Sequence, residues 1–175
     1  MRNFRRGSAT LWMVIWLPCL LVLFCVLVGV ANLWLARIEL ENALEAAALA
    51  AVKQWGDAGG GDTQEPGEVG AAYALANAVR QKPVVIGAAD LVFGAVDHTD
   101  PGNVVFLAGA MPRYSGNQRF GVRAQAKVPV QPLCFSPLLG TLSQQQVQAK
   151  ATAEYDGSVR RPKLIRVDAF VGPGR

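Results

Sequence analysis

One uncharged segment constrains this chain more than any other feature. Residues 7–36 contain no Asp, Glu, Lys, Arg or His, and residues 11–35 read LWMVIWLPCLLVLFCVLVGVANLWL. An α-helix of that length would measure about 37 Å, more than the roughly 30 Å hydrocarbon core of a bilayer. Thirteen Leu, Ile, Val and Phe residues between Leu11 and Val30 favour insertion by roughly 4 to 8 kcal/mol in total. The sequence therefore predicts a transmembrane helix over residues 11–36.

The flanking charges predict the orientation of this helix. Arg2, Arg5 and Arg6 lie in the basic segment 1–10, whereas all 13 acidic residues follow the apolar run. By the positive-inside rule, we expect the N-terminus in the cytoplasm and everything after the helix outside it.

A cleavable signal peptide is the alternative to this anchor. The stretch Gly29-Val30-Ala31 has the small-x-small form of a signal-peptidase site, so a cleaved chain would begin at Asn32. However, the apolar run is longer than the 7 to 15 residues of an ordinary signal peptide and continues past that point. We therefore favour an uncleaved signal anchor, with membrane lipid as its first partner.

Length, charge and cysteine content limit the remaining possibilities. With 175 residues, the chain has room for one anchor and one small domain. The net charge is +4, but three of the 17 basic residues precede the anchor, which leaves 14 basic against 13 acidic groups after it. Such a balance does not favour nucleic acid as a partner. Cys19 and Cys25 lie in the apolar segment, so Cys134 alone cannot form a disulfide framework.

The helix is expected to continue outward over residues 37–55. No Gly or Pro occurs between Leu33 and Trp55, and the stretch LENALEAAALAA is rich in strong helix formers. One face carries an apolar stripe formed by Leu40, Leu44, Ala47 and Ala51. Because most of these side chains are small, a partner helix or sheet could approach closely. The stripe is therefore a candidate partner-binding surface, although it could equally pack on the protein's own β domain.

The rest of the chain reads as an α+β domain. Glycine and small polar residues predict a flexible loop over 56–67, followed by a domain over 68–158 and an irregular basic tail over 159–175 whose end is expected to be loose. Helical spacing predicts a second helix over 68–81, which Pro83 would stop. Beyond it the period changes to two, as in antiparallel strands. The expected strands are 84–86, 90–96, 104–107, 120–130 and 146–155.

Charge is distributed unevenly after the anchor. Residues 37–100 carry 4 basic and 10 acidic groups, a net −6, whereas residues 101–175 carry 10 basic and 3 acidic groups, a net +7. The two halves could neutralise each other within one molecule or steer head-to-tail self-association. In the strand FGVRAQAKV, Arg123, Gln125 and Lys127 alternate with apolar residues, which predicts one solvent-exposed face.

The sequence offers little for catalysis. The only histidine is His98, in VDHTDPGN, so a tethered hydrolase would have to depend on it. Asp97, His98 and Asp100 could contact a metal, but they lack a fourth ligand, and an Asp-Pro-Gly turn explains them more simply. We therefore expect no enzymatic activity, no cofactor and no metal site.

The N-terminal residues carry a family resemblance. The segment RRGSATLWMVIWLPCLLVLFCVLVGVANLWLARIELENALEAAALAA resembles the start of the TadE/TadG-like proteins of the bacterial tight-adherence (Tad, or Flp) pilus system. A weaker similarity to the strand-rich tail of TadG-like members follows in FGVRAQAKVPVQPLCFSPLLGTLSQQQVQAKATAEYDG. The positions that fit the N-terminal pattern are Arg5, Arg6, Gly7, Pro18, Arg37, Leu40, Asn42, Ala43, Ala46, Ala47, Ala48, Leu49 and Ala50.

One departure from the family pattern bears on processing. Members processed like pilins keep a glutamate five residues after the cleavage glycine, and if Gly7 is that glycine the position is Trp12. The resemblance thus implies an uncleaved, TadG-type structural component of the bacterial cytoplasmic membrane. Its implied partners are other Tad pilus-assembly or minor pilin proteins. The alternative is a membrane-tethered module that binds cell-wall or surface glycan through its sheet.

Overall fold

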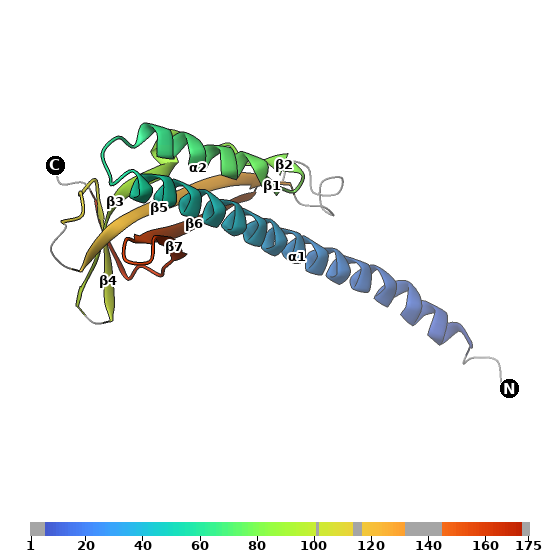
Figure 1. Cartoon of the computed structure of the whole chain (residues 1–175). Helices are drawn as coiled ribbons and strands as arrows, with labels where there is room; N and C mark the ends of the chain where they lie inside the picture. The colour runs from blue at the N-terminus through green and yellow to red at the C-terminus, as the bar shows by residue number, and fades with distance from the viewer. Residues whose placement is uncertain (1–5, 101, 114–116, 132–144, 173–175) are drawn as a thin grey trace. The chain divides into compact units, whose positions relative to one another are not determined.

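A computed structural model describes residues 6–100, 102–113, 117–131 and 145–172, with the backbone alone for residues 6–11 and 88. The chain has the predicted α+β architecture, with a long N-terminal helix, a short second helix and a β-rich domain (Figure 1). It divides into two compact units. The first contains residues 1–35 and 129–146, and the second contains residues 36–128 and 147–175.

Helix α1, Arg6–Asp57, contributes to both units and confirms the single helix expected from the sequence. Within the first unit, side chains 12–31 are exposed or half-exposed to their surroundings. Burial begins at Asn32, whose Nδ2 donates a hydrogen bond to the Gln131 carbonyl oxygen at 3.3 Å. The uncovered apolar stretch is therefore about 30 Å long, which matches the hydrocarbon core of a bilayer.

Helix α2, Gln64–Ala76, begins and ends earlier than the predicted helix over 68–81. Its start lies inside the stretch expected to be a loop. There the Gln64 backbone N–H donates to the Asp62 carboxylate, and Pro66 is tolerated because first-turn N–H groups need no helical partner.

The end of α2 explains the rest of this error. Asn77 follows the helix in an extended conformation, and a small antiparallel hairpin comes next, formed by β1, Ala78–Val79, and β2, Lys82–Pro83. Arg80 and Gln81 make its turn with φ angles of +50° and +64°. Such angles are uncommon for residues other than glycine, so the sequence carries no clear turn signal there.

The main sheet has six strands in the order β7-β6-β5-β3-β4-β8. Strand β3 pairs antiparallel with β4 and β5, whereas β4 and β8 are parallel, so the sheet is mixed rather than purely antiparallel. A short 3₁₀ helix, Ala88–Asp90, precedes β3. The strands are β3, Leu91–Asp100; β4, Asn103–Ala108; β5, Gln118–Val130; β6, Gln145–Asp156; β7, Arg161–Leu164; and β8, Ala169–Val171.

Two sequence expectations about strands were wrong. Residues 84–86 form no strand, although Val84 and Ile86 are buried. The tail, expected to be irregular, contains β7 and β8, which pair with β6 and β4 at opposite edges of the sheet; its end at 173–175 lies outside the described residues. These short strands form because each sheet edge offers unpaired backbone groups.

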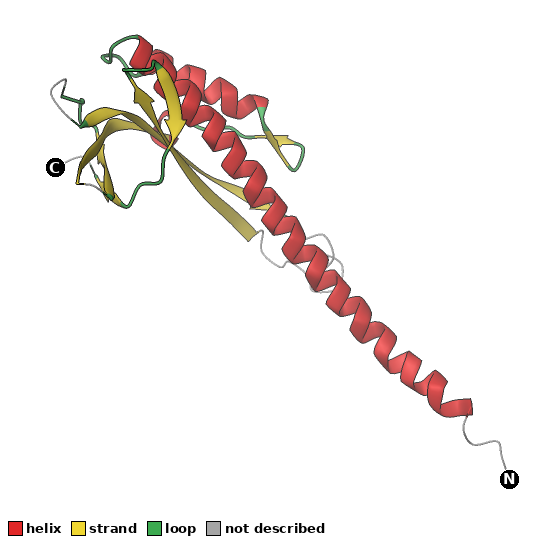
Figure 2. Ribbon diagram, turned by 60° about the horizontal axis from the view of Figure 1, so that its bottom comes forward, coloured by secondary structure: helices red, strands yellow, loops and turns green. Residues whose placement is uncertain are grey.

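Both helices of the second unit cover one face of the sheet (Figure 2). The Trp55 ring packs edge-on against Phe93 and Phe120, with ring centroids 5.3 and 4.8 Å away. On the opposite face, a smaller cluster of Val96, Phe106 and Ala108 packs against Ile165 and Val167 of the C-terminal segment. The sheet is thus covered on both sides.

Candidate functional site

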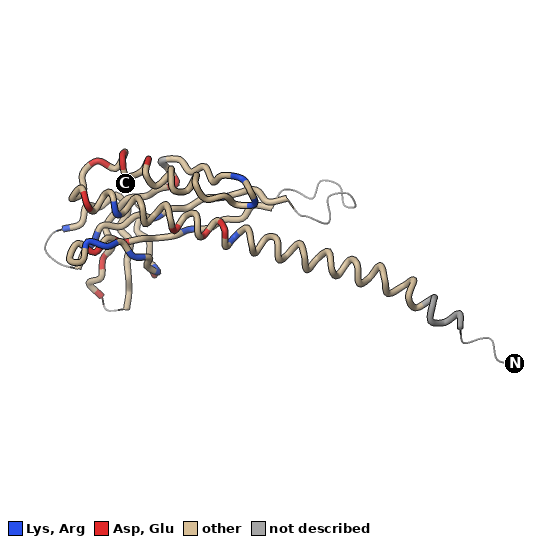
Figure 3. The backbone as a smooth tube through the Cα atoms, turned by 45° about the vertical axis from the view of Figure 1, so that its right-hand side comes forward, with Lys and Arg blue, Asp and Glu red and all other residues tan. Residues whose placement is uncertain are grey.

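The apolar part of α1 is the first functional feature. Among the described residues, one helix is long and apolar enough to cross a membrane, and its most apolar window has no buried residue. Residues 12–36 of this helix include no Asp, Glu, Lys or Arg, and Figure 3 draws that stretch without red or blue. Trp12 and Trp16 stack with ring centroids 6.2 Å apart. Amphipathic rings of this kind are typical of the interface between lipid and water.

The predicted partner-binding stripe is buried. Leu40, Leu44, Ala47 and Ala51 have no exposed surface. The closest packing is at Gly70 of α2, where an added Cβ would lie 3.0 Å from the Ala47 carbonyl oxygen and the Ala51 Cβ. The alternative that the sequence left open, packing on the protein's own domain, is therefore the arrangement found. Docking of a partner on the alanine-rich helix stays a prediction.

The solvent-facing side of the same helix also carries small residues. Asn42 is exposed, and Ala46, Leu49 and Ala50 are half-exposed. These four residues, called the outer side of α1 below, are accessible on the chain as it stands. Because the helix turns 100° per residue, Asn42, Ala46 and Leu49 lie roughly opposite the buried stripe, and Ala50 lies at its flank.

A buried carboxylate lies at the centre of a charged cluster on the sheet. The Glu154 side chain is fully buried, and its oxygens lie 2.5 Å from His98 Nε2, 3.0 Å from an Arg119 guanidinium nitrogen and 2.8 Å from Lys163 Nζ. Arg119 also pairs with Asp156 at 2.9 Å. The cluster joins β3, β5, β6 and β7, four strands brought together only by the fold.

Two opposed effects set the pKa of Glu154. Burial raises this pKa, but hydrogen bonds from Lys163 and His98, together with their charges, lower it by more, so the net pKa lies below its ordinary value. The carboxylate is therefore ionised at neutral pH and balances the surrounding cations.

His98, on which a tethered hydrolase would depend, is engaged by Glu154 in this cluster. No Ser, Thr or Cys side chain within the described part of the chain donates a hydrogen bond to His98. Asp97, the neighbouring candidate metal ligand, instead accepts hydrogen bonds from Thr99 and from Gln118 Nε2. The arrangement is that of a structural ion-pair network.

Ion pairs between Lys or Arg and carboxylates do not neutralise the opposite net charges of residues 37–100 and 101–175. Among the described residues, each Lys or Arg pair joins groups of the same half, as in Lys53–Asp57 and Arg119–Glu154. His98–Glu154 is the contact that crosses between them. Self-association through these complementary charges remains a prediction.

The fold and the exposed apolar helix define a single-pass, membrane-anchored α+β protein. Residues 7–54 match the family model described as "Putative Flp pilus-assembly TadE/G-like". The matched residues lie within α1 and include none of the sheet. No curated protein and no solved structure matches the chain significantly. Together, the match and the apolar helix support a membrane-anchored component of the Tad type.

Proposed function

We propose that the chain is a structural, non-enzymatic assembly component of a Tad (Flp-type) pilus or a related secretion machinery. The observation that carries this proposal is the coincidence of the matched residues 7–54 with α1, whose side chains 12–31 are left uncovered. Trp12 stands where processed members keep a glutamate, which supports a retained, TadG-type anchor. Other Tad pilus-assembly or minor pilin proteins are its proposed partners.

The proposed orientation places the N-terminus in the cytoplasm and the sheet outside the bacterial cytoplasmic membrane. Arg2, Arg5 and Arg6 supply the charge bias that supports it. Fusing alkaline phosphatase or green fluorescent protein to the C-terminus tests this proposal in cells. We expect an active phosphatase and a dark fluorescent protein, and the reverse pattern would contradict the orientation.

We place the docking surface on the outer side of α1, because the buried stripe is occupied by the chain's own domain. Small side chains let the backbones of two helices approach closely, so Ala46 and Ala50 suit a helical partner. Leu49, beside Ala46 on the same outer side, adds an apolar anchor. This surface needs no opening of the domain.

Co-purification from detergent tests docking on this side. Ala46→Lys should lower recovery of Tad partners at least tenfold, because a charge would then have to be buried at the interface. Tyr73→Lys, on the exposed side of α2, makes the same charge change elsewhere and should leave recovery intact. Ala47→Lys is unsuitable, because it would bury a charge inside the domain. Full recovery with Ala46→Lys would refute this docking surface and leave the membrane anchor standing.

A further inference from the structure

A cavity of about 400 Å³ opens in the second unit between α1, β5, β6 and the segment after β7. Three cationic side chains line it, namely Arg123, Lys150 and Arg166. Glu45 is the carboxylate among its described lining residues. The lining therefore carries three positive charges against one negative charge, a net +2.

The three cations have no carboxylate partner among the described residues, where none of them forms an ion pair. The Nε of Arg123 is buried without a hydrogen-bond partner. Its guanidinium carbon lies 4.5 Å from the centroid of the Phe170 ring, a cation–π contact that holds the group in place. A buried donor without an acceptor is costly, so the packing on Phe170 must offset that cost.

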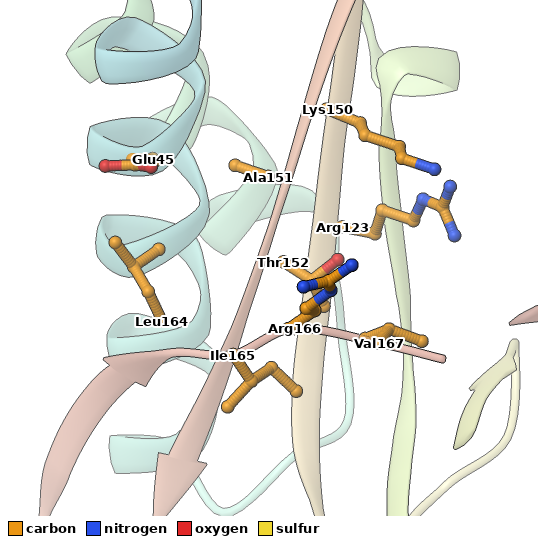
Figure 4. A pocket seen from close by; sticks show the side chains of 9 residues that line it. All are labelled: Glu45, Arg123, Lys150, Ala151, Thr152, Leu164, Ile165, Arg166 and Val167. Atoms are coloured by element: carbon orange, nitrogen blue, oxygen red, sulfur yellow. The ribbon is translucent and has the colours of Figure 1, made fainter. Parts of the chain in front are cut away.

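Two of the three cationic groups lie side by side. Figure 4 shows Arg123 and Lys150 extending in the same direction from the neighbouring strands β5 and β6, while the Arg166 guanidinium lies beside Thr152. Glu45 lies apart from them, on α1. Arg123 and Lys150 thus form one pair of neighbouring positive groups in the lining, and Arg166 with the Thr152 hydroxyl forms a second polar spot.

We propose that this pocket binds a phosphate group carried by an organic ligand. Guanidinium groups present paired N–H donors that match phosphate oxygens, and a net +2 lining suits a doubly charged anion better than a single carboxylate. Leu164, Ile165 and Val167 complete the lining and provide apolar surface for the organic part. The phosphate can belong to a phospholipid headgroup or to a soluble phosphorylated sugar or glycerol. This phosphate binding is separate from the proposed role in pilus assembly.

Calorimetric titration of the full chain in a neutral detergent tests the proposal. The probes are glycerol 3-phosphate, for a soluble source, and dihexanoyl-phosphatidic acid, whose phosphate is also a monoester, for a lipid source. Similar affinity for both assigns the site to a soluble phosphate, whereas tenfold tighter lipid binding assigns it to a headgroup. The absence of saturable binding to either probe overturns the proposal.

Matched variants locate the binding. Arg166 and Lys150 have exposed side chains, so Arg166→Gln and Lys150→Gln should fold, and each should weaken binding at least tenfold. Lys82→Gln, in the separate β1–β2 hairpin, removes the same charge and should change affinity less than twofold. Equal affinity in all three variants, or an equal loss in all three, would show that the pocket is not the site.

Discussion

Glu154 is the residue on which the charged contacts of the domain converge. Replacing it with Gln keeps its shape but leaves Arg119 and Lys163 without their buried counter-charge. Breaking a fully buried pair costs about 3 to 5 kcal/mol; because these cations are partly exposed, we expect a loss of about 2 kcal/mol for Glu154→Gln. Urea unfolding of the detergent-solubilised chain measures this loss. Glu68→Gln, at an exposed position of α2, is the control and should unfold like the unchanged protein.

The same carboxylate predicts how stability depends on pH. Because the pKa of Glu154 is lower in the folded chain, its contribution is fully present above its ordinary value of 4.5 and is lost as the pH falls through the folded-state pKa. Hydrogen bonds from Thr99 to Asp97 and from Ser158 to Asp156 lower those pKa values as well. Unfolding midpoints measured from pH 7 to pH 3 should therefore fall most steeply below about pH 4.5.

Glu154→Gln provides the matching control for this pH series. The variant should lose the largest single share of the acid-dependent decline, since it removes the deepest of the titrating carboxylates. An unchanged slope would mean that other carboxylates carry the effect.

Arg123 and Glu154 show what sequence reasoning could not reach at this scale. Alternation in β5 placed Arg123 on a face expected to be exposed, yet its guanidinium packs on Phe170. Glu154 likewise looked like one polar residue of an alternating strand. Phe170 on Arg123 and Lys163 on Glu154 both come from the C-terminal segment, and the sequence alone did not show that this segment would fold back over the sheet.

At the scale of elements, two glycines of α2 differ in the space around them. An added Cβ at Gly70 would crowd Ala47 and Ala51 at 3.0 Å, whereas at Gly67 the nearest atom is 3.9 Å away on Phe93. Gly70→Leu should therefore lower the free energy of unfolding by about 1 to 3 kcal/mol. Gly67→Ala should be neutral or add up to about 1 kcal/mol, because Ala favours the helix. Thermal unfolding of both variants tests the pair, and an equal response would contradict close packing of α2 on α1.

Helices and strands whose own sequences have a clear apolar period were predictable. Elements that form only by pairing or turning against other strands were not. The apolar run and the alanine-rich stretch specified α1, and alternation specified β3 to β6 to within a few residues. The end of α2 was missed because Arg80 and Gln81 adopt positive φ without glycine. Strands β7 and β8 are only four and three residues long and gain their hydrogen bonds from the edges of the sheet.

At the scale of the whole molecule, the free energy of membrane insertion is the sum of small contributions from many residues. Arginine near the helix centre costs about 3 kcal/mol, so the double change Leu21→Arg with Phe24→Arg adds about 6 kcal/mol and cancels most of the apolar gain. Both side chains are exposed on α1. Carbonate extraction should release this variant into the soluble fraction.

The control for insertion places the same two charges elsewhere. Asn42→Arg with Tyr73→Arg changes exposed positions beyond the apolar stretch and should leave the chain in the membrane pellet. Retention of both double variants would indicate an anchor other than residues 12–31. Release of both would show that extraction reports unfolding rather than insertion.

The strands that cover α1 lie far after it in the sequence, so they leave the ribosome much later than the helix. Strand β5 begins at Gln118, about 60 residues after α1 ends at Asp57, and β6 begins later still. The ribosome therefore delivers the alanine-rich face well before the strands that shield it, and contacts so distant in sequence form slowly. Alanine exposes less apolar area than leucine, so the alanine-rich face is less prone to aggregation before the strands cover it. The part of the helix beyond the membrane segment must therefore avoid aggregation until the last strands arrive.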